Sequence, residues 1–98
     1  MIGMFAVSLA GHDKGRLYFI AGEEGDFAYL TDGKSRGIDN PKKKRKKHLQ
    51  IIKTKDETLA KKLMDGKTIY NEEIKFAIKI CNQNQNEDLR RRACQRLT

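Results

Sequence analysis

The feature that most constrains the fold is a series of three short apolar runs between Met4 and Thr31, separated from one another by glycine-bounded segments. The runs are MFAVSLA, LYFIA and FAYLT, and the intervening segments are GHDKG and GEEGD. Runs of about five residues are too short for helices and are typical of strands. We therefore expect three antiparallel strands joined by hairpins.

Two weaker strand signals follow this meander. Asp32-Gly33 indicates a turn, because glycine adopts the positive φ that a tight turn requires. After it, residues 34–38 are expected to form a short fourth strand, and residues 48–54 (HLQIIKT) a fifth. Five short twisted strands tend to curl and close on themselves, since closure removes unpaired sheet edges. The sequence thus predicts a mainly β fold, a small barrel over residues 1–55.

Beyond Lys55 the apolar residues take on helical spacing. Asp56 can cap a short helix that carries Leu59 and Leu63, and Gly66 can end it. A second helix is expected to have Asn71 as its cap and an apolar face that packs on the barrel. Glu72 and Glu73 lie in its expected first turn, and the face consists of Ile74, Ala77, Ile78 and Cys81.

The end of the chain gives a weaker pattern. The run NQNQN at residues 82–86 is expected to interrupt the second helix. A last helix with Leu89, Ala93 and Leu97 among several arginines is one expectation for the remainder, and a disordered basic terminus is the other. Residues 56–98 are interpreted as an α-helical extension of the same domain.

Positive charge is concentrated in the second part of the chain. Residues 1–40 carry four basic and six acidic side chains, whereas residues 41–98 carry 17 basic and seven acidic ones. Concentrated positive charge attracts phosphate polyanions and releases their condensed counterions. Nucleic acid is therefore the expected partner, and an anionic membrane surface is the weaker alternative.

The densest charge lies in PKKKRKKH, residues 41–48. A basic run of this length is typical of nuclear-import signals and of nucleic-acid contacts. Pro41 favours extended backbone at Asn40 and a strand-like segment follows directly, so we place the lysines on a connection inside the folded domain. Six adjacent cations repel one another, and this repulsion opposes folding unless a polyanion neutralises it. We interpret the run as a phosphate-contacting segment.

The loop between the first two strands is bracketed by Gly11 and Gly15 and can turn tightly. Its backbone N–H groups could donate to a phosphate, with Lys14 and Arg16 adding charge. An ordinary β-turn accounts for the same residues. A Walker-type loop does not, because Gly15 is followed by Arg16 and a strand pattern instead of Lys-Ser/Thr and a helix.

Several function classes are not expected. Ser8, His12 and Asp13 are too close in sequence for a catalytic triad, and 98 residues leave little room for a large buried pocket. We expect a non-enzymatic protein without a cofactor, metal or small-molecule substrate.

Cys81 and Cys94 form no Cys-x-x-Cys pair, which favours reduced thiols in a cytoplasmic protein. A mean hydropathy of −0.75 argues against a membrane protein, and the first residues read as a strand instead of a signal peptide.

Three segments together resemble the KOW-motif proteins: VSLAGHDKGRLYFI, YLTDGKSR and PKKKRKKHLQ. The resemblance covers residues 5–53, centres on Gly15, and is strongest to bacterial KOW-domain RNA-binding proteins related to ribosomal large-subunit proteins. His12 stands where the family often has a basic residue. The resemblance implies an SH3-like barrel that binds RNA, commonly ribosomal RNA, without catalysis.

The predicted RNA contacts come from the first loop, the turn after the third strand and the basic run. They are Gly11, His12, Lys14, Gly15, Arg16, Lys34, Arg36, Lys42, Lys43, Lys44, Arg45, Lys46, Lys47 and His48. Phosphate contacts give steep salt dependence and little base discrimination, so we expect recognition of structured RNA through its backbone. Ribosomal RNA is the expected target, and ribosomal proteins are possible neighbours.

Two questions stay open at this point. Tyr18, Phe19, Phe27 and Tyr29 can stack on unpaired bases or pack within the sheet, and core packing is the more common role. Arg90, Arg91 and Arg92 can add a second RNA contact or form a solvated tail. The alternative function is a protein-interaction module of a translation or transcription factor, which would use an open barrel edge or the helix face with Ile74 and Ile78.

Overall fold

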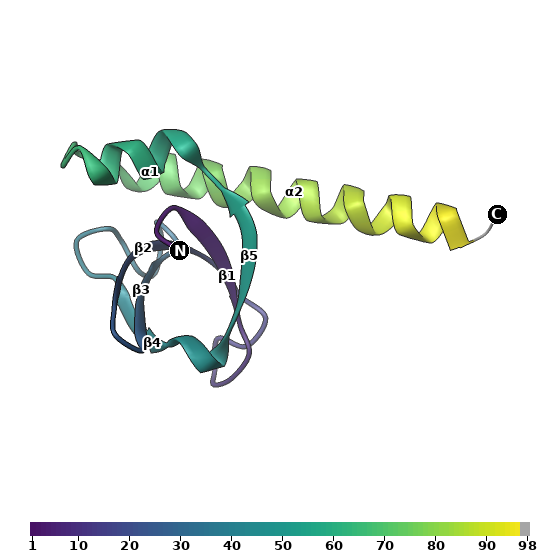
Figure 1. The fold of residues 1–98 in the computed structure, drawn as a ribbon, viewed down its shortest axis with the longest axis horizontal. Coiled ribbons are helices and arrows are strands. Elements are labelled where there is room, and N and C mark those ends of the chain that lie inside the picture. Colours follow the sequence, from purple (N-terminus) through teal and green to yellow (C-terminus); the bar gives the residue numbers. More distant parts are fainter. Residues whose placement is uncertain (97–98) are drawn as a thin grey trace.

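The computed structural model describes the backbone of residues 1–96 and the side-chain surroundings of residues 1–83. The first three strands are β1 (Met4–Ser8), β2 (Leu17–Glu24) and β3 (Phe27–Thr31), and they pair antiparallel in sequence order. The meander predicted from the glycine-separated apolar runs is confirmed (Figure 1).

The fourth strand is formed by the basic run and not by residues 34–38, so that prediction is wrong. Strand β4 is Lys42–Arg45 and pairs antiparallel with β3, whereas residues 34–38 lie in a loop. A 3-10 turn, Lys46–His48, leads into β5 (Leu49–Lys55), which pairs with β1 and confirms the expected fifth strand.

The sheet is five-stranded, antiparallel and strongly curled, with the strand order β4-β3-β2-β1-β5 (Figure 1). The expected barrel is not closed, because β4 and β5 are the two edges of the sheet. Strand β4 is only four residues long, and the chain passes from it to the other edge through the 3-10 turn instead of through a ladder of hydrogen bonds. The fold is thus a small β-rich domain with an open sheet.

Side chains alternate between the two faces of the sheet and build two apolar clusters. The inner face of the curl carries Ala6, Tyr18, Ile20, Ala28, Leu30 and Leu49, all buried. The outer face carries Phe5 and Phe19, whose rings meet edge to face at 5.7 Å between centroids. Because successive residues of a strand point to opposite faces, the meander supplies both clusters.

Helix α1 (Glu57–Met64) begins and ends as predicted. The side chain of Asp56 accepts a hydrogen bond from the Leu59 N–H at 3.0 Å, which is the expected N-terminal cap. Gly66 follows the helix with φ +69°. Leu59 is buried in the outer cluster, so α1 covers part of the outer face of the sheet.

Helix α2 (Asn71–Arg96) covers the same outer face with the predicted apolar residues. Ile74, Ala77 and Cys81 are buried against Phe5 and Phe19, and Ile78 is half-buried beside them. The first acidic residues of α2 are Glu72 and Glu73, as expected for the positive end of the helix dipole.

The cap of α2 is Tyr70 and not Asn71. The Tyr70 carbonyl accepts from the Ile74 N–H, and the Tyr70 N–H donates to the Glu73 carboxylate at 3.0 Å. This arrangement is the backbone half of a capping box. The Asn71 side chain instead accepts from the Ile38 N–H at 2.8 Å, and so ties the loop before β4 to the helix.

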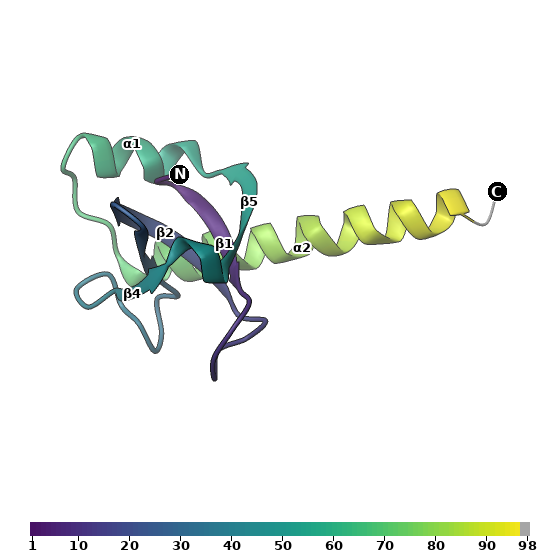
Figure 2. The ribbon, with the colours of Figure 1, turned by 60° about the horizontal axis from the view of Figure 1, so that its bottom comes forward.

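The predicted interruption of α2 at residues 82–86 is wrong, because the helix continues through them to Arg96. Figures 1 and 2 show that this later part of α2 extends beyond the sheet. Asparagine and glutamine are weaker helix formers than alanine, but they do not break a helix as proline does. The side chains of Leu89, Ala93 and Arg90 to Arg92, and all of residues 97–98, lie outside the described part. In the described residues, neither helix is long and apolar enough to cross a bilayer.

Candidate nucleic-acid interface

The basic run forms a paired β-strand, so its side chains alternate between two environments. In the β3–β4 register, Lys42 lies opposite Leu30 and Lys44 opposite Ala28. Residues directly opposite one another in an antiparallel pair share a face of the sheet. Lys42 and Lys44 therefore lie on the inner face, and the residue between them, Lys43, lies on the outer face.

The inner-face lysines converge on Asp13 from the first loop. The Nζ atoms of Lys42 and Lys44 each lie 2.7 Å from an Asp13 carboxylate oxygen. Ser8 Oγ and Tyr18 Oη donate to the same carboxylate at 2.9 and 3.0 Å. We call these five residues, Ser8, Asp13, Tyr18, Lys42 and Lys44, the Asp13 network. It links the loop after β1 to the edge strand β4.

Lys44 is the most enclosed cation of the network, with 11% of its side chain exposed. Its ammonium group donates to Asp13, to the Ala10 carbonyl at 2.7 Å and to the Ser8 hydroxyl. An ammonium group has three donors, and all three are used. Lys44 therefore has no donor left for a phosphate.

The electrostatics of Asp13 agree with a structural role. Burial by itself would raise the pKa of its carboxyl group, but the hydrogen bonds from Lys42, Lys44, Ser8 and Tyr18 outweigh burial and lower the pKa well below its usual range. Burial and the bond to Asp13 raise the pKa of Tyr18. Asp13 is thus ionised and Tyr18 neutral at physiological pH.

Lys46 continues the alternation at the start of the 3-10 turn. Its Nζ lies 2.9 Å from the Glu23 carboxylate, and the ion pair lowers the pKa of Glu23. Glu23 is exposed, so solvent screens this pair far more than the buried pairs of Asp13. Three of the six cations in the basic run are therefore matched by carboxylates of the protein itself.

The other three cations, Lys43, Arg45 and Lys47, are exposed. Within the described residues no carboxylate forms a salt bridge with them. Lys43 and Arg45 lie over the ring of half-buried Phe27, at 4.6 and 5.5 Å from its centroid. Cation–π contacts of this kind restrain the side chains without neutralising them. Lys43 and Arg45 lie on β4 and Lys47 lies in the 3-10 turn that follows it, and we call these three residues together the β4 cations.

The structure therefore divides the six cations of the predicted contact into a paired group and an exposed group. The prediction assumed that mutual repulsion needs an external polyanion, but the two carboxylates of Asp13 and Glu23 already pair with three of the six cations and offset two of the six positive charges. Asp13 is 29 residues away from Lys42 in sequence, so only folding reveals the pairing. The geometry leaves the β4 cations available to a phosphate backbone.

The first loop is more tightly bonded than expected. The N–H groups of Lys14, Gly15 and Arg16 donate to the carbonyls of Gly11, Ser8 and Asp13. These three amides are not available to a phosphate. The exposed side chains of the loop, His12, Lys14 and Arg16, are the part that an anion can reach. Gly11 and Gly15 have φ of +87° and +89°, which favours glycine at both positions.

The remaining predicted site residues occupy other places. Lys34 is exposed and Arg36 half-buried in the loop between β3 and β4. His48 is half-buried at the end of the 3-10 turn, where its carbonyl accepts from the Leu9 N–H at 2.9 Å. Arg16 and Lys34 line one cavity together with Lys75 and Lys79 of α2, two lysines that the sequence did not single out.

The aromatic residues divide between core and surface. Tyr18 and Phe19 are buried, so neither ring can stack on a base. Phe27 and Tyr29 are half-buried on the outer face beside the β4 cations. The Tyr29 hydroxyl donates to Glu24 at 2.6 Å.

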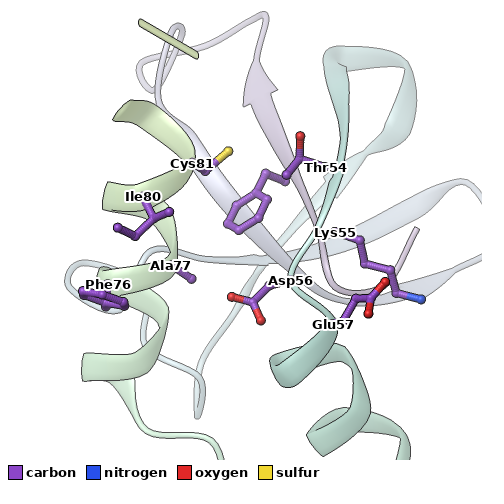
Figure 3. A pocket seen from close by; sticks show the side chains of 9 residues that line it. Thr54, Lys55, Asp56, Glu57, Phe76, Ala77, Ile80 and Cys81 are labelled. Carbon is purple, nitrogen blue, oxygen red and sulfur yellow. The ribbon is translucent and has the colours of Figure 1, made fainter. Parts of the chain in front are cut away.

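A second cavity of about 350 Å³ lies between α2 and the corner where β5 meets α1 (Figure 3). Phe5, Ala77 and Cys81 contribute buried surface to it, and Asp56 lies on the facing wall. Burial raises the pKa of the Cys81 thiol, which disfavours the reactive thiolate. Phe76 and Ile80 of α2 border the cavity and are exposed by 66% and 40%.

The sequence matches no family model, and a search of curated proteins returns no match either. The resemblance to KOW-motif proteins therefore stays a prediction from the three quoted segments.

Proposed function

We propose that this chain is a non-enzymatic RNA-binding protein that contacts the phosphate backbone of structured RNA through the β4 cations. The observation that supports this proposal most is the alternation along β4, which leaves every second cation exposed while its neighbours, Lys42 and Lys44, are paired with Asp13. A paired strand holds cations at a regular spacing on one surface, and phosphate oxygens are the ligands that such an array favours.

The first loop extends this surface in the proposal. Lys14 and Arg16 supply exposed charge, and the Asp13 network fixes their loop to β4. Phe27 and Tyr29 offer half-buried rings next to Lys43 and Arg45. Mixed cationic and aromatic surfaces suit nucleic acid, because the cations follow the backbone while the rings contact bases.

The resemblance to KOW-motif proteins makes the proposed target and location more specific. It favours ribosomal RNA as the target, ribosomal proteins as neighbours and a cytoplasmic location. It also suggests that the curled five-stranded sheet is an open form of the SH3-like barrel. Crosslinking the protein to RNA in cells and sequencing the attached fragments tests this part: peaks in ribosomal RNA are expected, and peaks confined to other transcripts would contradict it.

The RNA surface is tested by the variant K43Q/R45Q/K47Q. Each neutralised phosphate contact contributes about −0.9 to the slope of log K against log salt concentration on a duplex. We expect the slope for a structured RNA hairpin to become shallower by about 2 to 3 units. Titrations at several salt concentrations measure it.

The matched control is K53Q/K61Q/K67Q, which removes the same charge from three exposed lysines outside the proposed surface. A uniform electrostatic effect would change both variants equally. Equal slopes for the two variants would remove β4 from the RNA site.

A protein-interaction module is the second candidate. The Ile74/Ile78 face cannot serve it, because Ile74 is fully buried and Ile78 packs against the same cluster. The exposed Phe76 and Ile80 beside the cavity of Figure 3, and the free edge of β5, favour this candidate instead. A protein that still co-purifies after nuclease treatment, and is lost with F76S/I80S, would support it.

A further inference from the structure

The cavity that contains Arg16 and Lys34 has a composition suited to anions. It has a volume of about 520 Å³ and lies between the loop after β3 and the first turns of α2. Its lining includes four cations, Arg16, Lys34, Lys75 and Lys79, and one carboxylate, Asp32. The cations come from three segments that are far apart in sequence, so the fold itself gathers them.

One oxygen of the single carboxylate of the cavity is used for hydrogen bonds within the loop. Asp32 Oδ1 accepts from the N–H groups of Lys34 and Arg36 at 2.8 and 2.9 Å. The Asp32 N–H and the Gly33 N–H both donate back to the Arg36 carbonyl. These bonds give the loop a fixed internal structure and use the carboxylate oxygen for backbone instead of for a lysine.

The loop is also fixed against α2. The Ile38 N–H donates to the Asn71 side chain, and Gly33 approaches the helix so closely that a Cβ there would lie 2.5 Å from the Asn71 carbonyl oxygen. Gly33 has φ +74°, which glycine adopts without strain. Lys34 is therefore held next to Lys75 by the backbone and not by a flexible tether.

Lys75 and Lys79 stand four residues apart on α2, and like charges at this spacing destabilise a helix. Among the described residues neither forms a salt bridge. A cavity with three positive charges in excess attracts anions, and the hydrogen bonds of the loop and of its contact with α2 fix the backbone from which Lys34 and Lys75 extend.

We propose that this cavity binds a phosphate group of the RNA backbone, as a second contact separate from β4. This inference rests on the proposed RNA-binding function and adds a specific site to it. Arg16 belongs both to the first loop and to the cavity, so it connects the two contacts. Lys75 and Lys79 are the residues that make the second contact distinct.

The test is the variant K75Q/K79Q, because glutamine keeps the part of the Lys75 stem that packs against Gly33 and removes only the charge. With a structured RNA hairpin, we expect the slope of log K against log salt to become shallower by about 1. Affinity at low salt is expected to fall by about tenfold, which corresponds to about 1.4 kcal/mol, because charged hydrogen bonds to the phosphate are lost. The control K61Q/K67Q removes equal charge from exposed residues outside the cavity and should keep more of the affinity.

The outcomes separate this inference from the function it rests on. If K75Q/K79Q behaves as the control does while K43Q/R45Q/K47Q loses affinity, the cavity is not an RNA contact and the β4 surface stands. If the wild-type protein binds no structured RNA at low salt, both proposals are wrong.

A second experiment tests whether the cavity binds RNA or a small anion. Isotope-labelled protein is titrated with inorganic phosphate alone and with the hairpin, and the backbone amide signals of Ser35 and Lys75 are followed. Shifts with the hairpin at much lower concentration than with phosphate support the inference. Shifts with phosphate and none with the hairpin would assign the cavity to a small anion and overturn it.

Discussion

The two faces of β4 use the same type of side chain for opposite purposes. On the inner face, Lys42 and Lys44 donate to a buried carboxylate and close the gap between the first loop and the edge strand. On the outer face, Lys43 and Arg45 keep their charge in solvent beside Phe27. The difference shows that the number of adjacent cations does not measure how much charge a protein offers to a partner. The alternation of side chains along the strand decides how much of that charge is exposed.

The largest expected effect is a loss of stability when Asp13, the carboxylate that Lys42 and Lys44 share on the inner face, loses its charge. D13N leaves two cations without a counter-charge in a largely buried site, and removing one partner of a buried ion pair costs about 3 to 5 kcal/mol. Urea unfolding of D13N should therefore show a lower free energy of unfolding by an amount in this range. D39N changes an exposed aspartate and is the control. A D13N protein as stable as D39N would show that the Asp13 network does not hold β4.

A smaller effect compares neighbouring lysines directly. K44M removes a cation whose three donors are all used, so we expect a loss of about 2 kcal/mol in the free energy of unfolding. K43M removes only a cation–π contact at an exposed site and should lose less than about 1 kcal/mol. The loss of RNA affinity should be larger for K43M than for K44M, and K43M should bind RNA more weakly than wild type. Equal stability losses for K43M and K44M would abolish the distinction between the faces.

The smallest expected effect is the change with pH in the stability that the Asp13 network contributes. The pKa of Asp13 lies below its ordinary value of 3.8 in the folded protein, so its contribution to stability is complete above that value and is lost as pH falls below it. The stability difference between wild type and D13N should therefore shrink from about pH 4 to about pH 3, by up to about 1.4 kcal/mol over this one pH unit. A difference that stays constant over this range would mean that Asp13 is not held ionised by its partners.

The features that the sequence could predict are those set by residues that lie close together in the chain. The meander follows from short apolar runs separated by glycine-bounded segments, and the apolar face of α2 follows from apolar residues at every third or fourth position; both signals are local in the sequence. The cap at Asp56 is local as well. These features were predicted, and the structure confirms them.

The missed features depend on residues that are distant in sequence. KKKR has no apolar alternation and reads as a loop, and it is a strand because β3 lies beside it and Asp13 accepts its inner lysines. Asn71 looks like a cap but bonds to Ile38, 33 residues earlier. The cavity with Lys75 and Lys79 gave no local signal either, because its members come from three separate segments.

The central claim is that only alternate cations of the basic run are free to bind RNA. Lysine acetylation with a small acylating reagent, followed by fragment mass spectrometry with and without a structured RNA hairpin, tests it in one measurement. We predict that Lys43 and Lys47 react quickly in the free protein and are protected by RNA, while Lys44 reacts slowly in both states. Equal reactivity of Lys43 and Lys44 in the free protein, or no protection of Lys43 and Lys47 by RNA, would contradict the claim.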